Sequence, residues 1–489
     1  MNNAEENEEI AQAIALSLRS HIEEQEQENE ELKLAIAASL GKTVDQLTAR
    51  DLLLGATDPV RKRKQPEEID IGSVTKRVDL SNTKYWEGTV KLTYIKGFTG
   101  PDYVTLKDII QKNDLKKAVV TSFVYSMDYI DEHFPINTNM VIVAHGRPAI
   151  SVKIGENRII IQPPLKDNKY GVFHNKLMLL FRSSSLRVVI GSANMVACDY
   201  EELENVVFMQ DFPELAVPLK SESDFPEFAK DICDVLDKMR VPTAVKEELF
   251  KYDFSKAKAR IVASVSGVFE GEEEYKKYGH TRLADIVRDI TGPLDPNNYP
   301  KVEMQTSSLG SLSVSYLQEI YQSFCGISSF SDGEAVRSGL QKNQLPPIDI
   351  IFPTRDTVTS SRYGGAGADS ICFNTATWRK PTFPKQVMCD SISHRQGALM
   401  HSKYIIATLP NSKSRVKGWI YCGSHNSTTS AWGKFTVSKA SKLPKLSISN
   451  WELGVVFPLY EDTDIPAPFL RPPPRYQPEQ DAWTQNMEW

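Results

Sequence analysis

VFHNKLMLLF at residues 172–181 returns, with changes, as MHSKYIIATL at residues 400–409. Each copy is followed by Gly-Ser-x-Asn, at 191–194 and 423–426, and then by a Glu before an apolar run, at Glu204 and Glu452. The order is the same in both copies, although His and Asn lie 20 residues apart in the first and 25 in the second. An ordered pair of this kind indicates an internal duplication, with two domains of one fold.

Short apolar runs flank these motifs and predict buried strands. In the first half they cover 118–124, 140–144, 158–161, 177–181 and 187–190, and in the second half 348–352, 403–407, 419–422 and 452–457. Residues 226–239 have the periodicity of an amphipathic helix. Strands mixed with helices predict an α/β sandwich in each half. We expect the domains at 81–262 and 263–489, and a proline-rich C-terminal stretch extended on the surface.

Residues 1–80 differ in composition and predict a mostly disordered acidic tail. They are rich in Glu, Gln and Asn and almost free of aromatic residues. Two short helical patches, 8–20 and 30–40, interrupt the tail, and a basic cluster follows at 61–64. Such a cluster is typical of a nuclear-localisation signal, whereas the plain alternative is a solvated linker. We therefore expect a nuclear protein.

Charge is distributed unevenly. Of the net charge of −6, residues 1–60 account for −9, with 13 acidic and 4 basic side chains, so the remainder carries +3. A mildly basic body can bind nucleic acid where its charge is local. The sequence has no run of about 18 apolar residues, which argues against a membrane span. Six scattered cysteines without a CxxC pair favour a reducing compartment.

The repeated motifs carry the groups that phosphodiester cleavage needs. Residues i and i+2 of a strand share a face, so the imidazole and ammonium of each His-x-Lys should point the same way. Each Gly-Ser-x-Asn follows an apolar run and predicts a tight turn whose amide can donate to a phosphate oxygen. The two units together predict one site with two imidazoles, two lysines and two amides: His174, Lys176, Asn194, His401, Lys403 and Asn426.

These groups can act without a metal or another cofactor. One neutral histidine attacks phosphorus, and the other, protonated, donates to the leaving group and later activates water. The lysines and asparagines hold the charged oxygens. Glu204 and Glu452 are candidates to hydrogen-bond one imidazole each and fix its tautomer. Metal-dependent hydrolysis is the weaker alternative, because no His/Cys/Asp spacing matches a ligand set.

The motifs resemble those of the phospholipase D superfamily, in which His-x-Lys, a spaced Asp, Gly-Ser and Asn occur twice. The Asp is missing here, because Phe181 and Thr408 stand five residues after the lysines. That departure is similar to the tyrosyl-DNA phosphodiesterase family, and the stretches SSLGSL (307–312), SAWG (430–433) and WELGVVF (451–457) agree with it. The resemblance covers roughly residues 85–475. It implies two phospholipase D-like α/β/α sandwich domains related by pseudo-twofold symmetry.

The resemblance also implies a reaction and a substrate. It implies hydrolysis of the 3′-phosphotyrosyl bond between DNA and a trapped topoisomerase I peptide, with His174 as nucleophile and His401 as general acid/base. The expected partner is single-stranded or nicked DNA, bound by a monomer. Positions implied to contact DNA are Tyr170, which would stack on a base, and Ser307, Ser308, Ser311 and Thr428. An ordinary turn is the alternative for the serines.

The two helical patches of the tail share a pattern that resembles ubiquitin-interacting motifs. After an acidic start come an apolar residue, an Ala and a Ser: Ile10, Ala13 and Ser17, then Leu32, Ala35 and Ser39. A small Ala on an apolar stripe lets a helix lie close to a flat hydrophobic patch. Frayed amphipathic helices or a weak coiled coil are the alternative.

Two other functions remain open at this point. One is a lipid phosphodiesterase of the same superfamily, and the other is an inactive scaffold that binds ubiquitin. The basic cluster, the missing Asp and the serine run disfavour the lipid enzyme. The intact His-x-Lys pairs disfavour the scaffold. We expect no binding to membranes.

Overall fold

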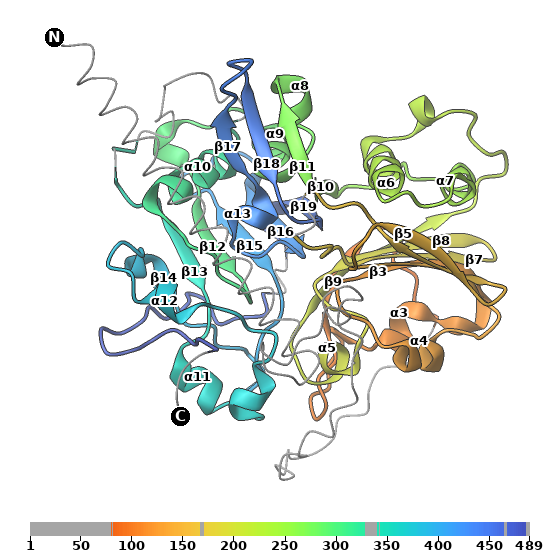
Figure 1. Cartoon of the computed structure of the whole chain (residues 1–489), viewed down its shortest axis with the longest axis horizontal. Coiled ribbons are helices and arrows are strands. Elements are labelled where there is room, and N and C mark those ends of the chain that lie inside the picture. The colour runs from red at the N-terminus through yellow and green to blue at the C-terminus, as the bar shows by residue number, and fades with distance from the viewer. Residues whose placement is uncertain are drawn as a thin grey trace.

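The computed structural model describes residues 80, 82–166, 171–327, 340–341, 343–463 and 467–485, and the fold is built on two mixed sheets (Figure 1). The first sheet has the order β2-β1-β9-β8-β7-β3-β4-β6-β5. Its strands are β1 (Thr89–Thr93), β2 (Tyr103–Val104), β3 (Leu115–Ser122), β4 (Asn139–Ala144), β5 (Ile150–Ile154), β6 (Arg158–Gln162), β7 (Leu177–Arg182), β8 (Ser185–Gly191) and β9 (Val206–Pro213). Its helices are α3 (Leu106–Ile110), α4 (Met127–His133), α5 (Ala197–Glu201), α6 (Glu227–Lys238) and α7 (Thr243–Leu249).

The second sheet has the order β10-β19-β16-β15-β12-β13-β14, and a small sheet, β11-β18-β17, lies beside it. The strands are β10 (Arg260–Ser264), β11 (Gly267–Glu270), β12 (Lys301–Gln305), β13 (Ile348–Ile351), β14 (Met388–Cys389), β15 (Tyr404–Thr408), β16 (Val416–Gly423), β17 (Lys434–Val437), β18 (Pro444–Ile448) and β19 (Glu452–Tyr460). The helices are α8 (Glu272–Tyr275), α9 (Gly279–Thr291), α10 (Val314–Phe324), α11 (Arg355–Thr359), α12 (Thr375–Trp378) and α13 (Thr429–Trp432).

Seven strands repeat between the sheets with the same order and orientation. In the first sheet β1, β9, β8, β7 and β3 are antiparallel neighbours, and β4 and β6 then follow parallel to β3. In the second sheet β10, β19, β16, β15 and β12 are antiparallel, and β13 and β14 follow in parallel. The duplication predicted from the motifs is therefore a duplication of the fold.

The expected division at 262/263 falls inside β10. All of β10, from Arg260, pairs with β19 in the second sheet. The chain therefore passes into the second half before Arg260, after α6 and α7. The amino-acid composition does not change where the chain enters the second half, because β10 is an apolar strand like its neighbours in the sequence. The sequence therefore contains no sign of this boundary.

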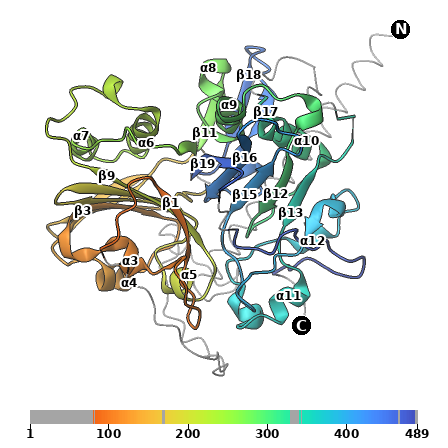
Figure 2. The ribbon, with the colours of Figure 1, turned by 180° about the vertical axis from the view of Figure 1, so that it is seen from behind.

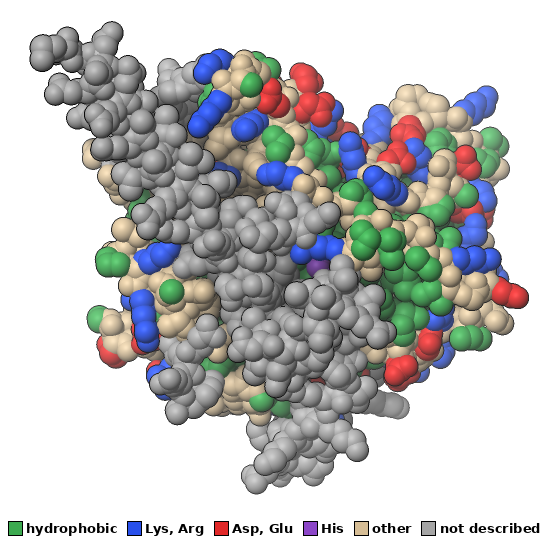
Figure 3. All heavy atoms as spheres, viewed as in Figure 1, with side chains coloured by type: hydrophobic (Ala, Val, Ile, Leu, Met, Phe, Trp, Pro, Cys, Tyr) green, Lys and Arg blue, Asp and Glu red, His purple; other side chains and the backbone are tan. Residues whose placement is uncertain are grey.

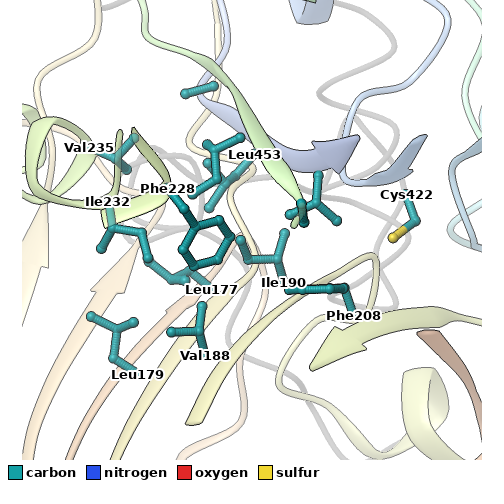
Figure 4. Packing of buried hydrophobic residues seen from close by; sticks show 14 of the residues in the cluster. Leu177, Leu179, Val188, Ile190, Phe208, Phe228, Ile232, Val235, Cys422 and Leu453 are labelled. Carbon is teal, nitrogen blue, oxygen red and sulfur yellow. The ribbon is translucent and has the colours of Figure 1, made fainter. Parts of the chain in front are cut away.

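Helices and sheets alternate in layers across the molecule (Figure 2). Helices α3 and α4 pack on one face of the first sheet, and α6 packs on the other. The cluster around α6 continues into the second sheet, and Figure 4 shows Phe228 of α6 between Ile190 and Leu453. The far face of the second sheet is covered by α9 and α10. One continuous apolar core therefore fixes the two halves against each other.

The C-terminal segment 467–485 lies on the surface as predicted only in its middle, where 470–472, 474–475 and 477–479 are exposed, whereas both of its ends are buried. Phe469 is fully buried, and so are Ala482 and Trp483 nearly at the end. Arg471 pairs with Glu303 at 2.5 Å, and Arg475 with Asp349 at 2.6 Å. The prolines keep the segment extended, but it runs as a strap along the second half and contributes to its core.

Candidate active site

The two His-x-Lys motifs lie just before strands, not inside them. β7 begins at Leu177 and β15 at Tyr404, one residue after each lysine. The expected alternation nevertheless holds, because Phe173 and Leu177 belong to the apolar core on one side. His174 and Lys176 therefore turn to the other side, and Lys176 Nζ donates to the His174 carbonyl at 2.9 Å. Lys403 Nζ donates to the His401 carbonyl in the same way.

The Gly-Ser-x-Asn turns follow β8 and β16, as predicted. Their glycines are needed because the backbone of the neighbouring strand lies very close to them. A Cβ on Gly191 would lie 2.6 Å from the Val206 carbonyl oxygen, and one on Gly423 would lie 2.5 Å from the Leu453 carbonyl oxygen. Glycine is required where two backbones approach this closely. The glycines let each turn close over the start of the adjacent strand, β9 or β19.

The asparagine amides are oriented by matching hydrogen bonds. Asn426 Oδ1 accepts from the Thr306 hydroxyl at 3.0 Å and from the Ser308 amide at 3.1 Å. Asn194 Oδ1 accepts from the Val124 amide at 3.4 Å. Because each oxygen is held by the loop after β12 or β3, the NH₂ group is the part left to donate to a ligand.

Glu452 lies where the sequence placed it, beside an imidazole. Its Oε2 is 2.7 Å from His174 Nδ1 and also accepts from the Ser424 hydroxyl at 2.5 Å. The contact crosses from the second half to the first. With Nδ1 facing a carboxylate, the Nε2 of His174 is the nitrogen available to a substrate.

Glu204 does not take the expected place beside the other imidazole, and this interpretation is wrong. Its carboxylate accepts from Ser393 Oγ and lies 3.3 Å from Arg395 Nη2. His401 Nδ1 instead faces Asp199 Oδ2 at 3.3 Å. Asp199 sits in α5 and also accepts the Asn194 amide proton at 2.6 Å.

Strand register explains the error. Gly191 pairs with Val207 and Gly423 with Gly454, so the residue equivalent to Glu452 is Asn205, not Glu204. The hydrogen bonds agree: Ser192 Oγ donates to Asn205 at 2.7 Å, as Ser424 Oγ does to Glu452. Glu204 and Glu452 are therefore one position out of register with each other, which only the pairing of β8 with β9 reveals.

Each histidine is also held by the backbone of the other half. The His174 amide donates to the Trp451 carbonyl at 2.9 Å, and the His401 amide donates to the Glu204 carbonyl at 2.9 Å. Residues 173 and 451 form one parallel bridge, and residues 204 and 400 form the other. Glu204 is thus the counterpart of Trp451. Neither histidine can be placed by its own half alone.

Four basic groups share this buried space. Burial lowers the pKa of each of them, and three are lowered further by their basic neighbours. Burial lowers the pKa of Lys176 to about 7, and burial together with Lys176 lowers the pKa of Lys403 well below its usual value. Burial and Lys403 lower the pKa of His401 to about 4, although Asp199 opposes the shift. Burial, with Lys176 and Lys403, lowers the pKa of His174 well below 6.5. Because these two histidines and two lysines have little negative charge around them, the site favours binding of an anion.

The two carboxylates respond differently to burial. Burial raises the pKa of Glu452 to about 8 despite Lys176. Burial also acts to raise the pKa of Asp199, but His401 and the Asn194 amide outweigh it, so that pKa lies below its usual value. His401 therefore faces an ionised carboxylate, and His174 faces one that resists ionisation.

The positions expected to contact DNA surround the second half-site in part. Ser307 is buried and Ser308 half-buried, and both donate backbone amides to Asn426. Ser311 is half-buried at the far end of that loop. Thr428 caps α13 by accepting from the Ala431 amide at 3.0 Å, which uses one acceptor site of its hydroxyl. Figure 3 shows histidine and basic side chains reaching the surface between the halves.

Several predictions lie outside the described residues. They are Tyr170, the two tail helices with Ile10, Ala13, Ser17, Leu32, Ala35 and Ser39, and the basic cluster 61–64. Within the described ranges, no group of three or more His, Cys, Asp or Glu side chains could hold a metal ion. The described helices also include none long and apolar enough to cross a membrane.

Comparison with known proteins agrees with this geometry. The structure aligns with crystal structures of yeast tyrosyl-DNA phosphodiesterase at a TM-score of 0.61 and 18% identity, over 82% of this chain and 100% of that one. A mutant of the yeast protein aligns at a TM-score of 0.62 and 17% identity, over 82% of this chain and 99% of that one. These matches show the fold alone, which is the duplicated α/β fold of the yeast protein.

The sequence narrows the class to one family. The family model for tyrosyl-DNA phosphodiesterase matches residues 89–485, and the chain belongs to that family. Tyrosyl-DNA phosphodiesterase 1 of Arabidopsis thaliana is 27% identical over 72% of this chain, which spans 58% of that relative's length. A probable tyrosyl-DNA phosphodiesterase of Schizosaccharomyces pombe is 24% identical over 75% of this chain and 81% of that protein. The ubiquitin interaction motif model matches residues 5–21 and 27–41.

Proposed function

We propose that the protein hydrolyses the 3′-phosphotyrosyl bond between DNA and a trapped topoisomerase I peptide, through a phosphohistidine intermediate. The observation that carries the proposal is the pair of imidazoles from opposite halves, each with Nδ1 against a carboxylate. Two buried lysines and two oriented amides accompany them. Nucleophile, proton donor and anion-holding groups thus meet in one place.

His174 is the nucleophile and His401 the general acid/base. In the free protein His401 is neutral, with a pKa of about 4. The negative charge of a bound phosphodiester, together with the ionised Asp199, stabilises its imidazolium, so His401 can then carry the proton that the tyrosyl oxygen receives. In the reacting form of His174, Nδ1–H donates to the ionised Glu452, which leaves the lone pair on Nε2 for attack at phosphorus. Because the pKa of Glu452 is raised to about 8, this form becomes more populated as the pH rises towards 8. His401 then takes a proton from water, which attacks the phosphohistidine. The DNA leaves with a 3′-phosphate and His174 is restored.

The lysines and amides hold the non-bridging oxygens during both steps. Lys176 and Lys403 are buried and regain full charge when a phosphate supplies the missing counter-charge. Asn194 and Asn426 donate from their NH₂ groups. Ser307, Ser308, Ser311 and Thr428 bind the DNA strand near the second half-site, and Tyr170 stacks on a base. The reaction needs no metal or cofactor, and the enzyme acts as a monomer.

The tail adds localisation and a second partner. The helices at 8–20 and 30–40 bind ubiquitin or ubiquitinated proteins, and the basic cluster at 61–64 directs the protein to the nucleus. The matches to the ubiquitin interaction motif support the first part. The substrate itself, a DNA lesion, supports a nuclear location.

The test uses an oligonucleotide with a 3′-phosphotyrosine, incubated with the full chain in excess chelator. We expect release of tyrosine and a free 3′-phosphate. No release under these conditions would contradict the proposal. A vesicle containing phosphatidylcholine serves as the control substrate, and hydrolysis of the lipid instead of the oligonucleotide would favour the lipid phosphodiesterase.

Two variants test the roles of the histidines. His401→Ala should accumulate a covalent protein–DNA species on a denaturing gel, because the phosphohistidine forms but water is not activated. His174→Ala should give no such species, because it lacks the nucleophile. Equal trapping by both variants would refute the assignment.

A further inference from the structure

We propose that Glu204, Arg395 and Ser393 form a positioning cluster that sets His401 for the water-activating step. The inference rests on the proposed function. It assigns a role to the buried Glu204, which does not contact an imidazole. The cluster acts through the backbone of His401, not through its ring.

Glu204 holds the segment that carries His401 by its backbone. The Glu204 carbonyl accepts from the amides of both His401, at 2.9 Å, and Ser402, at 3.0 Å. The Glu204 amide donates to the Leu399 carbonyl at 2.8 Å. Residues 399–402 are thereby fixed at three points by one residue of the other half. A movement of Glu204 therefore moves the His401 ring relative to Asp199.

The Glu204 side chain is what fixes Glu204 itself. It is fully buried, and its carboxylate lies between Ser393 Oγ and the Arg395 guanidinium, which is 2% exposed. Ser393 Oγ also accepts the Arg395 amide proton at 2.9 Å, so the three residues form one closed unit.

Arg395 ties that unit to the first sheet. Its Nη1 donates to the Thr93 carbonyl of β1 at 2.6 Å, and its guanidinium lies 4.5 Å from the centre of the Tyr103 ring of β2. Arg395 belongs to the second half, whereas Thr93, Tyr103 and Glu204 belong to the first. The ion pair thus crosses the boundary between the halves next to the segment it serves.

The equivalent position in the other half makes the same backbone bridge but is anchored differently. Trp451 makes the same backbone bridge to His174, and it is anchored by its indole, which donates to the Pro164 carbonyl at 2.9 Å. A packed indole is insensitive to charge. The buried ion pair on the His401 side depends on both partners, because an unpaired charge there is costly.

The two chemical steps depend unequally on His401. A tyrosyl oxygen is a stable leaving group, so its departure tolerates a displaced acid, whereas water attacks slowly without a well-placed base. Displacement of a catalytic group by about 1 Å can cost about 100-fold in rate. Weakening the cluster should therefore slow decay of the phosphohistidine much more than its formation.

The experiment measures both steps in single turnover with the 3′-phosphotyrosyl oligonucleotide. Glu204→Gln should release tyrosine within about threefold of the wild-type rate, while decay of the covalent species slows about 100-fold. Ser393→Ala, a milder change, should slow decay by a smaller factor and serves if Glu204→Gln does not fold. Decay at the wild-type rate in both variants would overturn the inference.

The matched control is the buried ion pair Arg187–Asp211, which lies wholly within the first half at 2.9 Å. Arg187→Gln should lower thermal stability without changing the ratio of the two rates. A ratio changed as much in Arg187→Gln as in Glu204→Gln would reduce the cluster to a general stability effect and refute positioning. If the wild type releases no tyrosine, the proposed function fails. Normal wild-type turnover with an unchanged ratio in the variants contradicts only this inference.

Discussion

His174 and His401 occupy equivalent places but have different carboxylate partners. Glu452 comes from β19 and Asp199 from the short helix α5, so the two contacts do not follow the symmetry of the sheets. At the place that symmetry assigns to a second Glu stands Asn205, bonded to Ser192. Asp199 ionises more readily than Glu452, so under the proposed mechanism it is the better partner for a protonated imidazole.

Sequence reasoning found the six His, Lys and Asn residues because motif order survives insertions. It missed Asp199, which lies in the acidic stretch 199–204 without a motif of its own. It misplaced Glu204 because a one-residue shift in strand register is invisible without the partner strand. Residues held by tertiary contacts, such as Arg395, carry no local signal at all.

The pH dependence of stability should reveal the buried neutral state of His401. Its pKa is about 4 in the fold, against 6.5 for the free side chain, because of burial and Lys403. Between these values the unfolded chain binds a proton that the native chain does not, so stability falls as pH drops from 6.5 to 4. In His401→Gln that contribution is gone. The loss of unfolding free energy from pH 6.5 to 4.5, measured by urea titration, should be smaller than in the wild type.

His394→Gln, which changes an exposed imidazole, is the control for that measurement. It should lose as much stability as the wild type over the same interval. An equally steep loss in His401→Gln would mean that His401 is not held neutral in the native state.

At the scale of elements, the buried strands were the most predictable feature. The runs predicted at 140–144, 177–181, 187–190 and 348–352 correspond to β4, β7, β8 and β13 within two residues at each end. Strands of a sheet covered on both faces are continuously apolar, which makes them conspicuous. The helix predicted at 226–239 is α6, at 227–238. The segments carrying the motifs were less predictable, since His174 and Lys176 precede the strand.

The C-terminal strap was predicted only in part, because its proline-rich middle is exposed but its two ends are buried. Trp483, 4% exposed, packs in the core of the second half. Trp483→Ala should therefore destabilise the protein by about 3–5 kcal/mol, the usual cost of removing a buried aromatic side chain. Urea-induced unfolding followed by circular dichroism measures this loss.

Trp86→Ala provides the comparison for the strap, since Trp86 is 39% exposed. It should cost much less than Trp483→Ala. Similar losses for the two variants would show that the strap is not part of the folding unit.

At the scale of the whole molecule, the tail and the catalytic body should be separable. Deleting residues 1–60 leaves the described fold, the basic cluster 61–64 and every residue of the candidate site in place. Turnover of the oligonucleotide should be unchanged, whereas retention on immobilised ubiquitin chains should be lost. Pull-down from purified components measures the second effect.

A point variant sharpens this test. Ala13→Gln combined with Ala35→Gln introduces a long side chain at the small position through which each motif is expected to approach ubiquitin. The full-length double variant should lose retention on ubiquitin as the deletion does. Retention unchanged in the deletion would refute the ubiquitin interpretation.

The exchange of backbone bridges between the halves has a consequence for how such a chain can change. In a symmetric dimer of single-repeat subunits, every substitution enters both half-sites at once. Here the same kind of bridge occurs twice in one polypeptide, once with Trp451 and once with Glu204. Each copy can therefore be altered while the other stays as it is. Under the proposed mechanism, the covalent fusion of two repeats is what allows one imidazole to act as the nucleophile and the other as the proton carrier.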